Sequence, residues 1–309
     1  MLLAAPALAH AETAYVSDEQ ANVVHVIDAP RWTQVVDIAV GKRPRGMVLS
    51  ADRKRLYVAA GNDGRIDVID LASRRVVDHL PSGPDPERFA LSPDGRRLYV
   101  ANEDDNSVSF VDIAAKKIVR AVAVGAEPEG MAVSPDGRWV ICTSESASLV
   151  HFIDATSGVL VDSVMVGTRP RDARFTADGR QLWVSSETRA TVAVFDMPSR
   201  RLLHTIDFDR DPHAPDTVQA VGIVLRPDSA YVALGRGNGV AEIDPRDFSV
   251  RRYLPAGSRD WGIGIGPDGK RLYAANGLSG DVSVIDLASG KTEATVKTGG
   301  KPWGVVVVP

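Results

Sequence analysis

The chain has 309 residues and a formal net charge of −4 at pH 7, which argues against a protein that binds nucleic acid through an overall positive charge. A single cysteine, Cys142, excludes an internal disulfide framework, and its spacing pattern predicts a small apolar core residue. No CxxCH motif for covalent haem attachment occurs in the sequence.

Residues 1–11 read MLLAAPALAHA, an apolar stretch that ends on the A-x-A pattern Ala9-His10-Ala11. This pattern is typical of a secretory signal and its cleavage site, although the basic start is missing, as in a truncated signal. An ordinary apolar N-terminal arm is the alternative interpretation. From this pattern we expect an exported, periplasmic protein with one domain over residues 12–309. No stretch after residue 11 is long enough to span a bilayer.

From Tyr15 onward, one motif recurs seven times at spacings of 42 residues, with a single spacing of 48. The copies begin at Tyr15, Tyr57, Tyr99, Ile141, Trp183, Tyr231 and Tyr273. An apolar residue followed by aspartate recurs in step, at Asp28, Asp70, Asp112, Asp154, Asp196, Asp244 and Asp286. Because seven copies of one position cannot all be catalytic, we expect these aspartates to cap turns.

Each copy contains four short strand patterns, which are clearest in the third copy at residues 97–102, 107–112, 117–124 and 130–134. These runs are rich in β-branched residues and are bounded by turn residues, and no amphipathic helix interrupts them. Four strands in about 42 residues are typical of a propeller blade. The sequence therefore predicts an all-β, seven-bladed β-propeller of four-stranded antiparallel blades.

The last strand pattern, residues 304–308, matches the innermost strand of a blade, and the unit that begins at Tyr15 lacks that strand. We therefore expect the C-terminal strand to complete the N-terminal blade and close the ring. The fourth strand pattern of most copies carries Lys or Arg, which would protect an outer blade edge from association.

The motifs Y-V-A-N, V-x-V-I-D and P-x-G resemble the YVTN family of β-propeller repeats over residues 15–309. More narrowly, the chain looks like the β-propeller family associated with PQQ-dependent catabolism. This resemblance implies a context of alcohol oxidation, with PQQ as a ligand or as the cofactor of a partner, and no covalently bound cofactor. It also implies a PQQ-dependent dehydrogenase or an ABC transporter component as a partner.

Candidate binding residues lie where the innermost strand begins, since the loops there open on the funnel of a propeller by analogy of fold. The second residue of this strand varies among the copies, as Arg45, Glu87, Glu129, Arg171, Val221, Trp261 and Trp303. The next residue is glycine except at Arg88 and Asp172. Two indoles and a guanidinium from adjacent blades could hold a flat or anionic ligand, whereas ion pairs that plug the channel are the alternative.

The single insertion, residues 207–219, is a candidate lid or docking loop that includes His213. Its alternating aspartates resemble a calcium loop, but the glycine and distal glutamate of that pattern are missing, so we expect no metal site.

Three functions remain open from the sequence. The first is a non-enzymatic binding or scaffold protein, which we expect to be a monomer without a membrane span. The second is a lactonase-like hydrolase that would use Glu87, Glu129, Arg171 and His213. The third is a propeller that binds single-stranded nucleic acid, with bases stacked on Trp261 and Trp303.

Overall fold

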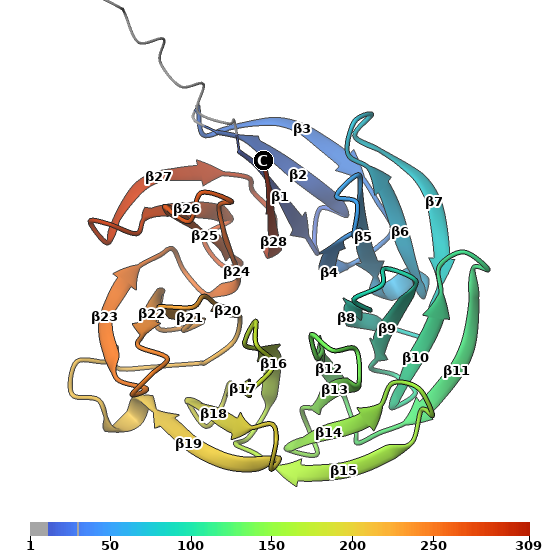
Figure 1. The fold of residues 1–309 in the computed structure, drawn as a ribbon. Helices are drawn as coiled ribbons and strands as arrows, with labels where there is room; N and C mark the ends of the chain where they lie inside the picture. The colour runs from blue at the N-terminus through green and yellow to red at the C-terminus, as the bar shows by residue number, and fades with distance from the viewer. Residues whose placement is uncertain (1–11, 30) are drawn as a thin grey trace, which may run out of the picture.

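The structure, a computed structural model, describes residues 12–29 and 31–309. Seven four-stranded antiparallel sheets surround a central axis, and Figure 1 shows them as a ring of blades. Two single turns of 3-10 helix, η1 (Gly61–Asp63) and η2 (Phe208–Arg210), are the only helices in this part of the chain. The predicted seven-bladed β-propeller is therefore confirmed.

Each blade has an innermost, a second, a third and an outermost strand, and blade 1 consists of β28, β1, β2 and β3. The innermost strands are β28 (Pro302–Val308), β4 (Pro44–Leu49), β8 (Pro86–Leu91), β12 (Pro128–Val133), β16 (Pro170–Phe175), β20 (Ile223–Leu225) and β24 (Asp260–Ile265). The second strands are β1 (Thr13–Asp18), β5 (Arg55–Ala60), β9 (Arg97–Asn102), β13 (Trp139–Ser144), β17 (Gln181–Ser186), β21 (Ala230–Ala233) and β25 (Arg271–Asn276).

The third and outermost strands follow in the same blade order, from blade 1 to blade 7. The third strands are β2 (Val23–Asp28), β6 (Arg65–Asp70), β10 (Ser107–Asp112), β14 (Leu149–Asp154), β18 (Thr191–Asp196), β22 (Gly239–Ile243) and β26 (Asp281–Asp286). The outermost strands are β3 (Thr33–Ala39), β7 (Arg75–Pro81), β11 (Lys117–Ala123), β15 (Leu160–Met165), β19 (Arg201–Asp207), β23 (Val250–Pro255) and β27 (Lys291–Lys297).

The ring closes as the sequence predicts. Strand β28 pairs with β1 in antiparallel register, with Thr13 opposite Val308 and Val16 opposite Val305. The backbone N–H of Gly304 also donates a hydrogen bond to Ser17 Oγ at 3.0 Å. Because β28 supplies the innermost strand of blade 1, the first and last segments of the propeller form one sheet.

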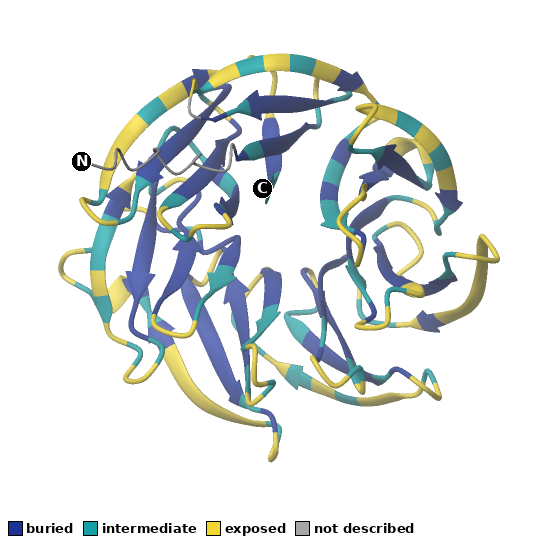
Figure 2. Cartoon of the chain, turned by 45° about the horizontal axis from the view of Figure 1, so that its top comes forward, coloured by how far each residue is buried: buried dark blue, intermediate teal, exposed yellow. Residues whose placement is uncertain are grey.

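The hydrophobic core lies between neighbouring blades. Tyr57 and Ala59 of blade 2, for example, pack with Phe89 and Val100 of blade 3 in one cluster. The second strands are buried on both faces, whereas the outermost strands are mostly exposed, with alternating covered residues in strands such as β3, as Figure 2 shows. Cys142 belongs to such a cluster and is fully buried, which confirms its prediction as a core residue, and burial raises the pKa of its thiol.

Glycine at the third position of the innermost strand allows the blades to meet near the axis. A Cβ on Gly46 would lie 2.6 Å from the carbonyl oxygen of Glu87 in the next blade, and a Cβ on Gly222 would lie 2.7 Å from that of Trp261. No side chain larger than hydrogen fits such a backbone contact without a shift.

Six of the seven repeated aspartates at the ends of the third strands accept a backbone N–H of the following turn, as the sequence predicts, whereas Asp28 forms an ion pair with Arg31. Asp70 accepts the backbone N–H of Ser73 at 2.8 Å, and Asp286 accepts that of Ser289 at 2.7 Å. The expected secretory segment, residues 1–11, lies outside the described residues. Within the ranges 12–29 and 31–309, no helix is long and apolar enough to cross a membrane.

Candidate functional site

Three positions of the repeat converge on one mouth of the central channel, which we call the axial mouth. The first position is a loop residue just before the innermost strand, which adopts positive φ at Arg43, Asp85, Glu127, Arg169 and Arg259. The second is the predicted series Arg45, Glu87, Glu129, Arg171, Val221, Trp261 and Trp303. The third follows the second strand and holds Glu19, Gly61, Glu103, Glu145, Glu187, Gly235 and Gly277.

Glu87 is the centre of an ion-pair group on blades 1 to 3. Its fully buried carboxylate accepts hydrogen bonds from Arg43 Nη2 at 2.7 Å and from Arg45 Nη1 at 2.6 Å. Arg45 also pairs with Glu19 at 2.9 Å. Burial alone would raise the pKa of Glu87, but the two guanidinium groups outweigh it and lower the pKa to about 2. Glu87 is therefore an ionised structural partner at neutral pH.

Glu103 lies beside Glu87 and titrates in a different range. Burial and the hydrogen bond to ionised Glu87 raise the pKa of Glu103 to about 7. Carboxylate oxygens of Asp85, Glu87 and Glu103 lie within 4.8 Å of one another, but the Arg43 guanidinium already pairs with Asp85 and Glu87. The guanidinium of Arg43 thus supplies positive charge to the cluster of Asp85, Glu87 and Glu103.

Arg171 and Arg88 form the second half of the network. Buried Arg171 pairs with Glu145 and lies 3.4 Å from Glu129 and 3.6 Å from Glu187. Arg88 Nε lies 3.8 Å from Glu129. Burial lowers the pKa of Arg88 and raises that of Glu129, because it disfavours the charged form of each group.

These longer separations leave buried polar atoms without hydrogen-bond partners in the described part of the chain. The donors are Nε and Nη2 of Arg88 and Nε of Arg171, and the acceptors are Oε1 of Glu129 and Oε2 of Glu187. Such groups are costly unless water or a ligand completes their hydrogen bonds.

The two tryptophans lie under arginines at this mouth. Arg88 and Arg45 approach the ring centroid of Trp303 at 4.4 and 5.7 Å. Arg259 and Arg171 approach that of Trp261 at 4.3 and 5.2 Å. The sequence places Trp261, Trp303 and Arg45 on adjacent blades, and the structure finds them on β24, β28 and β4 of the closed ring.

Asp172, which replaces a glycine, connects blades 5 and 6. Its carboxylate accepts the backbone N–H of Ile223 at 3.0 Å and lies 3.3 Å from Arg174 and 3.7 Å from Arg88. Strand β20 has only three residues, so Asp172 satisfies a donor at its first residue, Ile223.

The insertion packs against blades 5 and 6. Phe208 is buried, Asp211 accepts a 2.6 Å hydrogen bond from the Tyr253 hydroxyl, and Arg189 pairs with Asp207. His213 is exposed, and its one hydrogen bond among residues 12–29 and 31–309 runs from its backbone N–H to Asp211. The described contacts therefore hold His213 in the insertion and do not bring it to Glu87, Glu129 or Arg171.

The axial mouth combines a buried layer with a solvent-exposed rim. The side chains of Glu129 and Glu187 are at most 3% exposed, whereas those of Arg43, Arg259 and Arg169 are 23%, 20% and 49% exposed. The ion pairs of the alternative interpretation are present. Each rim arginine keeps part of its side chain exposed to solvent and already pairs with a carboxylate, Arg43 with Glu87, Arg169 with Glu145 and Arg259 with Glu187.

Sequence reasoning missed Glu103, the outer loop residues and Asp260. The repeat alignment held a signal for Glu103, because Glu occupies the third position in four of seven copies. Asp260 is fully buried and accepts backbone N–H groups of Leu234 and Gly239 at 3.0 and 3.1 Å. Burial outweighs these donors and raises its pKa to about 8, and no pattern in the sequence marks it.

Comparison with known proteins supports the fold and part of the repeat. The family described as the cytochrome D1 heme domain matches residues 87–172, which is less than half of the chain. No curated protein sequence matches the chain.

Solved structures share the propeller fold at low sequence identity. Hydrazine synthase of Kuenenia stuttgartiensis is 21% identical, with a TM-score of 0.80 over 89% of this chain and 92% of the other. The dihydro-heme d1 dehydrogenase NirN in complex with DHE is 17% identical, with a TM-score of 0.71 over 95% of this chain and 74% of the other. A putative 6-phosphogluconolactonase from Bacteroides uniformis is 20% identical, with a TM-score of 0.77 over 96% and 99% of the two chains.

Proposed function

We propose that the chain is a non-catalytic binding propeller that holds a planar, polyanionic ligand at the axial mouth. The observation that carries this proposal is the pairing of Trp261 and Trp303 with arginines whose buried N–H donors lack acceptors. Trp303 is buried beneath Arg88, so the surface on which an aromatic ligand can stack is that of the partly exposed Arg259 and Trp261. The acid groups of the ligand can accept charge-assisted hydrogen bonds. Rigid neighbouring blades hold these groups in place before the ligand arrives.

The resemblance of the repeats to the PQQ-associated propeller family makes PQQ, a planar quinone tricarboxylate, the first ligand to test. In this proposal the protein is exported and assists PQQ-dependent alcohol oxidation, next to a dehydrogenase or an ABC transport component. The match of residues 87–172 to the cytochrome D1 heme domain supports a second planar polyacid, a tetrapyrrole. Both ligands share the chemistry that the axial mouth presents.

Charge at the mouth defines where the acid groups of the ligand would bind. Six arginines face nine carboxyl groups, which are Glu19, Asp85, Glu87, Glu103, Glu127, Glu129, Glu145, Asp172 and Glu187. The excess acid lies on blades 3 and 4, which supply six of these carboxyl groups and a single arginine, Arg88, whereas Arg259 lies beside Trp261 on blade 7. The ligand should therefore occupy the tryptophan side of the mouth.

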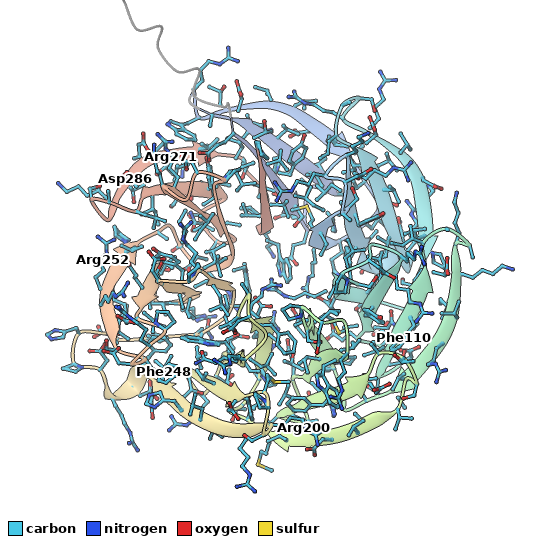
Figure 3. The ribbon with its side chains drawn as sticks, in the orientation of Figure 1. Phe110, Arg200, Phe248, Arg252, Arg271 and Asp286 are labelled. Atoms are coloured by element: carbon cyan, nitrogen blue, oxygen red, sulfur yellow. The ribbon has the colours of Figure 1, made fainter. Side chains whose placement is uncertain are left out.

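A binding panel tests the proposal. We expect PQQ or hemin to bind the full chain in calorimetric titrations, and citrate, a non-planar tricarboxylate, to bind at least about tenfold more weakly. Arg259→Gln should weaken binding of the planar ligand by a similar factor, because Arg259 is part of the rim and stacks on Trp261. The matched control is Arg271→Gln, since Arg271 stacks on Trp32 at 5.1 Å and lies near the outer edge in Figure 3.

Two outcomes would contradict the proposal that this protein binds a planar ligand. Equal affinity for citrate and PQQ would remove the role of the tryptophans, and the absence of binding by both planar ligands would remove the proposal. Lactone hydrolysis that Glu103→Gln abolishes would instead support the hydrolase alternative, because Glu103 is the half-buried acid whose pKa is about 7.

A further inference from the structure

The exposed large hydrophobic side chains are concentrated on one sector of the propeller rim. Among the described residues, six of the eleven lie on blades 4 and 5, and we call these six the rim sector. They are Val159, Leu160, Val161, Met165, Leu202 and Leu203. Met165, at 78% exposure, is the most exposed of the eleven. A cluster of this kind on a water-exposed surface indicates an interaction site.

Strand β15 lacks the basic side chains that protect most outer edges of this propeller, and its one charged residue is Asp162. Five of the seven outermost strands carry Lys or Arg, and β15 (LVDSVM) and β3 (TQVVDIA) carry neither. Strand β3 exposes a single large hydrophobic residue, Val35, whereas β15 exposes Leu160, Val161 and Met165. The rim sector is therefore the place where the protection of the outer edge is weakest.

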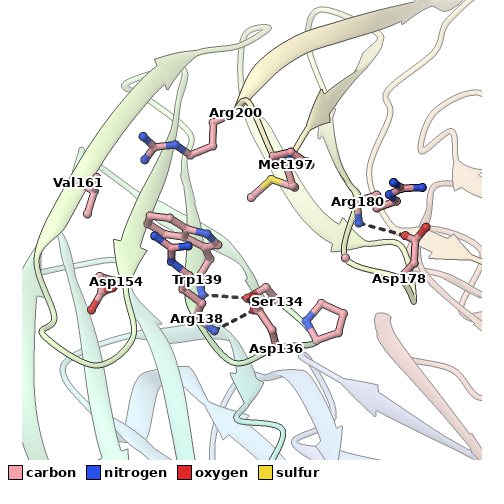
Figure 4. A pocket seen from close by; sticks show the side chains of 13 residues that line it. Ser134, Asp136, Arg138, Trp139, Asp154, Val161, Asp178, Arg180, Met197 and Arg200 are labelled. Carbon is pink, nitrogen blue, oxygen red and sulfur yellow. Dashed lines mark hydrogen bonds between the residues drawn. The ribbon is translucent and has the colours of Figure 1, made fainter.

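A groove of about 570 Å³ lies beside β15, between blades 4 and 5 (Figure 4). Its apolar lining includes Trp139, Val161 and Met197. Arg138 and Arg200 approach the Trp139 ring centroid at 4.9 and 5.1 Å. Val161 belongs to both the groove and the rim sector, so the two form one continuous surface.

The charges that line the groove are balanced. Three arginines (Arg138, Arg180, Arg200) and three aspartates (Asp136, Asp154, Asp178) contribute to its walls. None of these arginines forms an ion pair within 4.0 Å in the described part of the chain. A partner of one charge sign would be repelled by half of this lining, whereas a surface with the same mixture of signs can complement it.

We propose that the rim sector is a two-fold interface at which a second copy of this chain binds, in place of the monomer expected from the sequence. A two-fold contact is self-complementary, so residue i meets residue j and residue j meets residue i. Leu160 and Met165 lie at opposite ends of β15, about 17 Å apart at 3.3–3.4 Å per residue. When two β15 strands cross in antiparallel directions, Met165 of one copy reaches the groove beside Val161 of the other.

Side chains, and not backbone pairing, form the contact. Leu160 is opposite Ile153 and Asp162 is opposite Phe152, so Val161 is the extra residue of a bulge in β15. A bulge interrupts the row of backbone groups that a regular added strand would need. The apolar side chains that project from the sector supply the surface instead.

Sedimentation velocity of the full chain, from about 1 µM to about 500 µM, tests the interface. We expect a concentration-dependent dimer, which Met165→Lys weakens at least about tenfold. The matched control is Leu278→Lys, because Leu278 is 63% exposed and lies on a loop of the axial mouth, away from the rim sector. Both side chains are exposed, so the variants should retain the thermal unfolding midpoint of the unmodified chain.

Cysteine cross-linking locates the contact. A mixture of the Val161→Cys and Met165→Cys chains should form a disulfide-linked dimer on mild oxidation, and neither chain alone should do so. The native Cys142 is fully buried and does not compete. A chain that remains monomeric over the whole concentration range, or a dimer that Met165→Lys leaves unchanged, overturns the proposal.

Discussion

Two buried histidines at equivalent positions of the third strand have opposite protonation preferences. His25 lies 2.7 Å from Asp37 and 3.2 Å from Asp18. Among the residues that the structure describes, His151 has no carboxylate partner, and its Nε2 accepts the backbone N–H of Gly125 at 3.0 Å. Burial lowers the pKa of His151 to about 4, whereas the two carboxylates outweigh burial at His25 and raise its pKa.

The opposite shifts predict opposite contributions to stability as pH changes. The contribution of His151 is complete above the unfolded pKa of about 6.5 and is lost as pH falls towards 4, because the unfolded chain then binds a proton that the folded chain excludes. The contribution of His25 is complete below about 6.5 and is lost as pH rises through its raised pKa.

Urea unfolding at several pH values measures both contributions. Between pH 6.5 and pH 5, His151→Asn should reduce the acid-induced loss of unfolding free energy, by up to about 1.4 kcal/mol per pH unit. The substitution His25→Asn should lower the free energy of unfolding more at pH 6 than at pH 9. The control is His204→Asn, because His204 is exposed. A pH profile that neither buried substitution changes would contradict these assignments.

At the scale of strands, the glycine of the innermost strand determines how closely two blades approach. A Cβ on Gly262 would collide with the carbonyl oxygen of Trp303, which is backbone and cannot rotate away. We expect Gly262→Ala to lower the free energy of unfolding by about 1–3 kcal/mol. The control is Gly264→Ala, whose Cβ would first meet the Val305 side chain at 3.1 Å. Equal costs in denaturant titrations would contradict the backbone collision.

The strands could be predicted because each strand pattern occurs in seven copies of the repeat. Tyr57 and its equivalents fix the second strand, and the regular spacing then fixes its neighbours. Side-chain partners at the axis were not predictable in the same way. Glu87 could pair within its own blade or with either neighbour, and only the three-dimensional approach of Arg43 and Arg45 selects its partners.

The sequence shows which residues differ from the repeat, but it does not show which contacts these residues make. Arg88 and Asp172 stand out because they replace glycine. Their roles depend on the shortened strand β20 and on the position of Trp303, which no pattern in the sequence specifies. The role of Asp260 could not be predicted for a similar reason, because the backbone N–H groups that it accepts belong to a hairpin of the preceding blade.

At the scale of the whole molecule, the ring is closed by a single strand. Strand β28 contributes Trp303 and Val308 to the buried interior, and the backbone N–H of Lys301 donates to Asp18 at 2.9 Å. An open ring would expose the inner edge of β1 and one face of blade 7 to water.

Removal of residues 302–309 should therefore abolish the cooperative unfolding of the full chain. Domains of this kind are stable by only about 5–15 kcal/mol, and the loss of an entire innermost strand is comparable to that margin. Calorimetry should show a broad transition at a lower temperature, whereas removal of Pro309 alone should have little effect, because that residue is exposed and outside the strand.

A synthetic peptide of residues 300–309 separates the loss of this strand from general damage. If ring closure is the missing interaction, the peptide should restore a cooperative transition to the shortened chain, by about 2.7 kcal/mol when it is present at 100 times its dissociation constant. A peptide with glycine in place of Trp303 should restore less, since its indole is buried and lies under Arg88. A shortened chain that unfolds at the same temperature as the full chain would show that the other six blades hold the ring without β28.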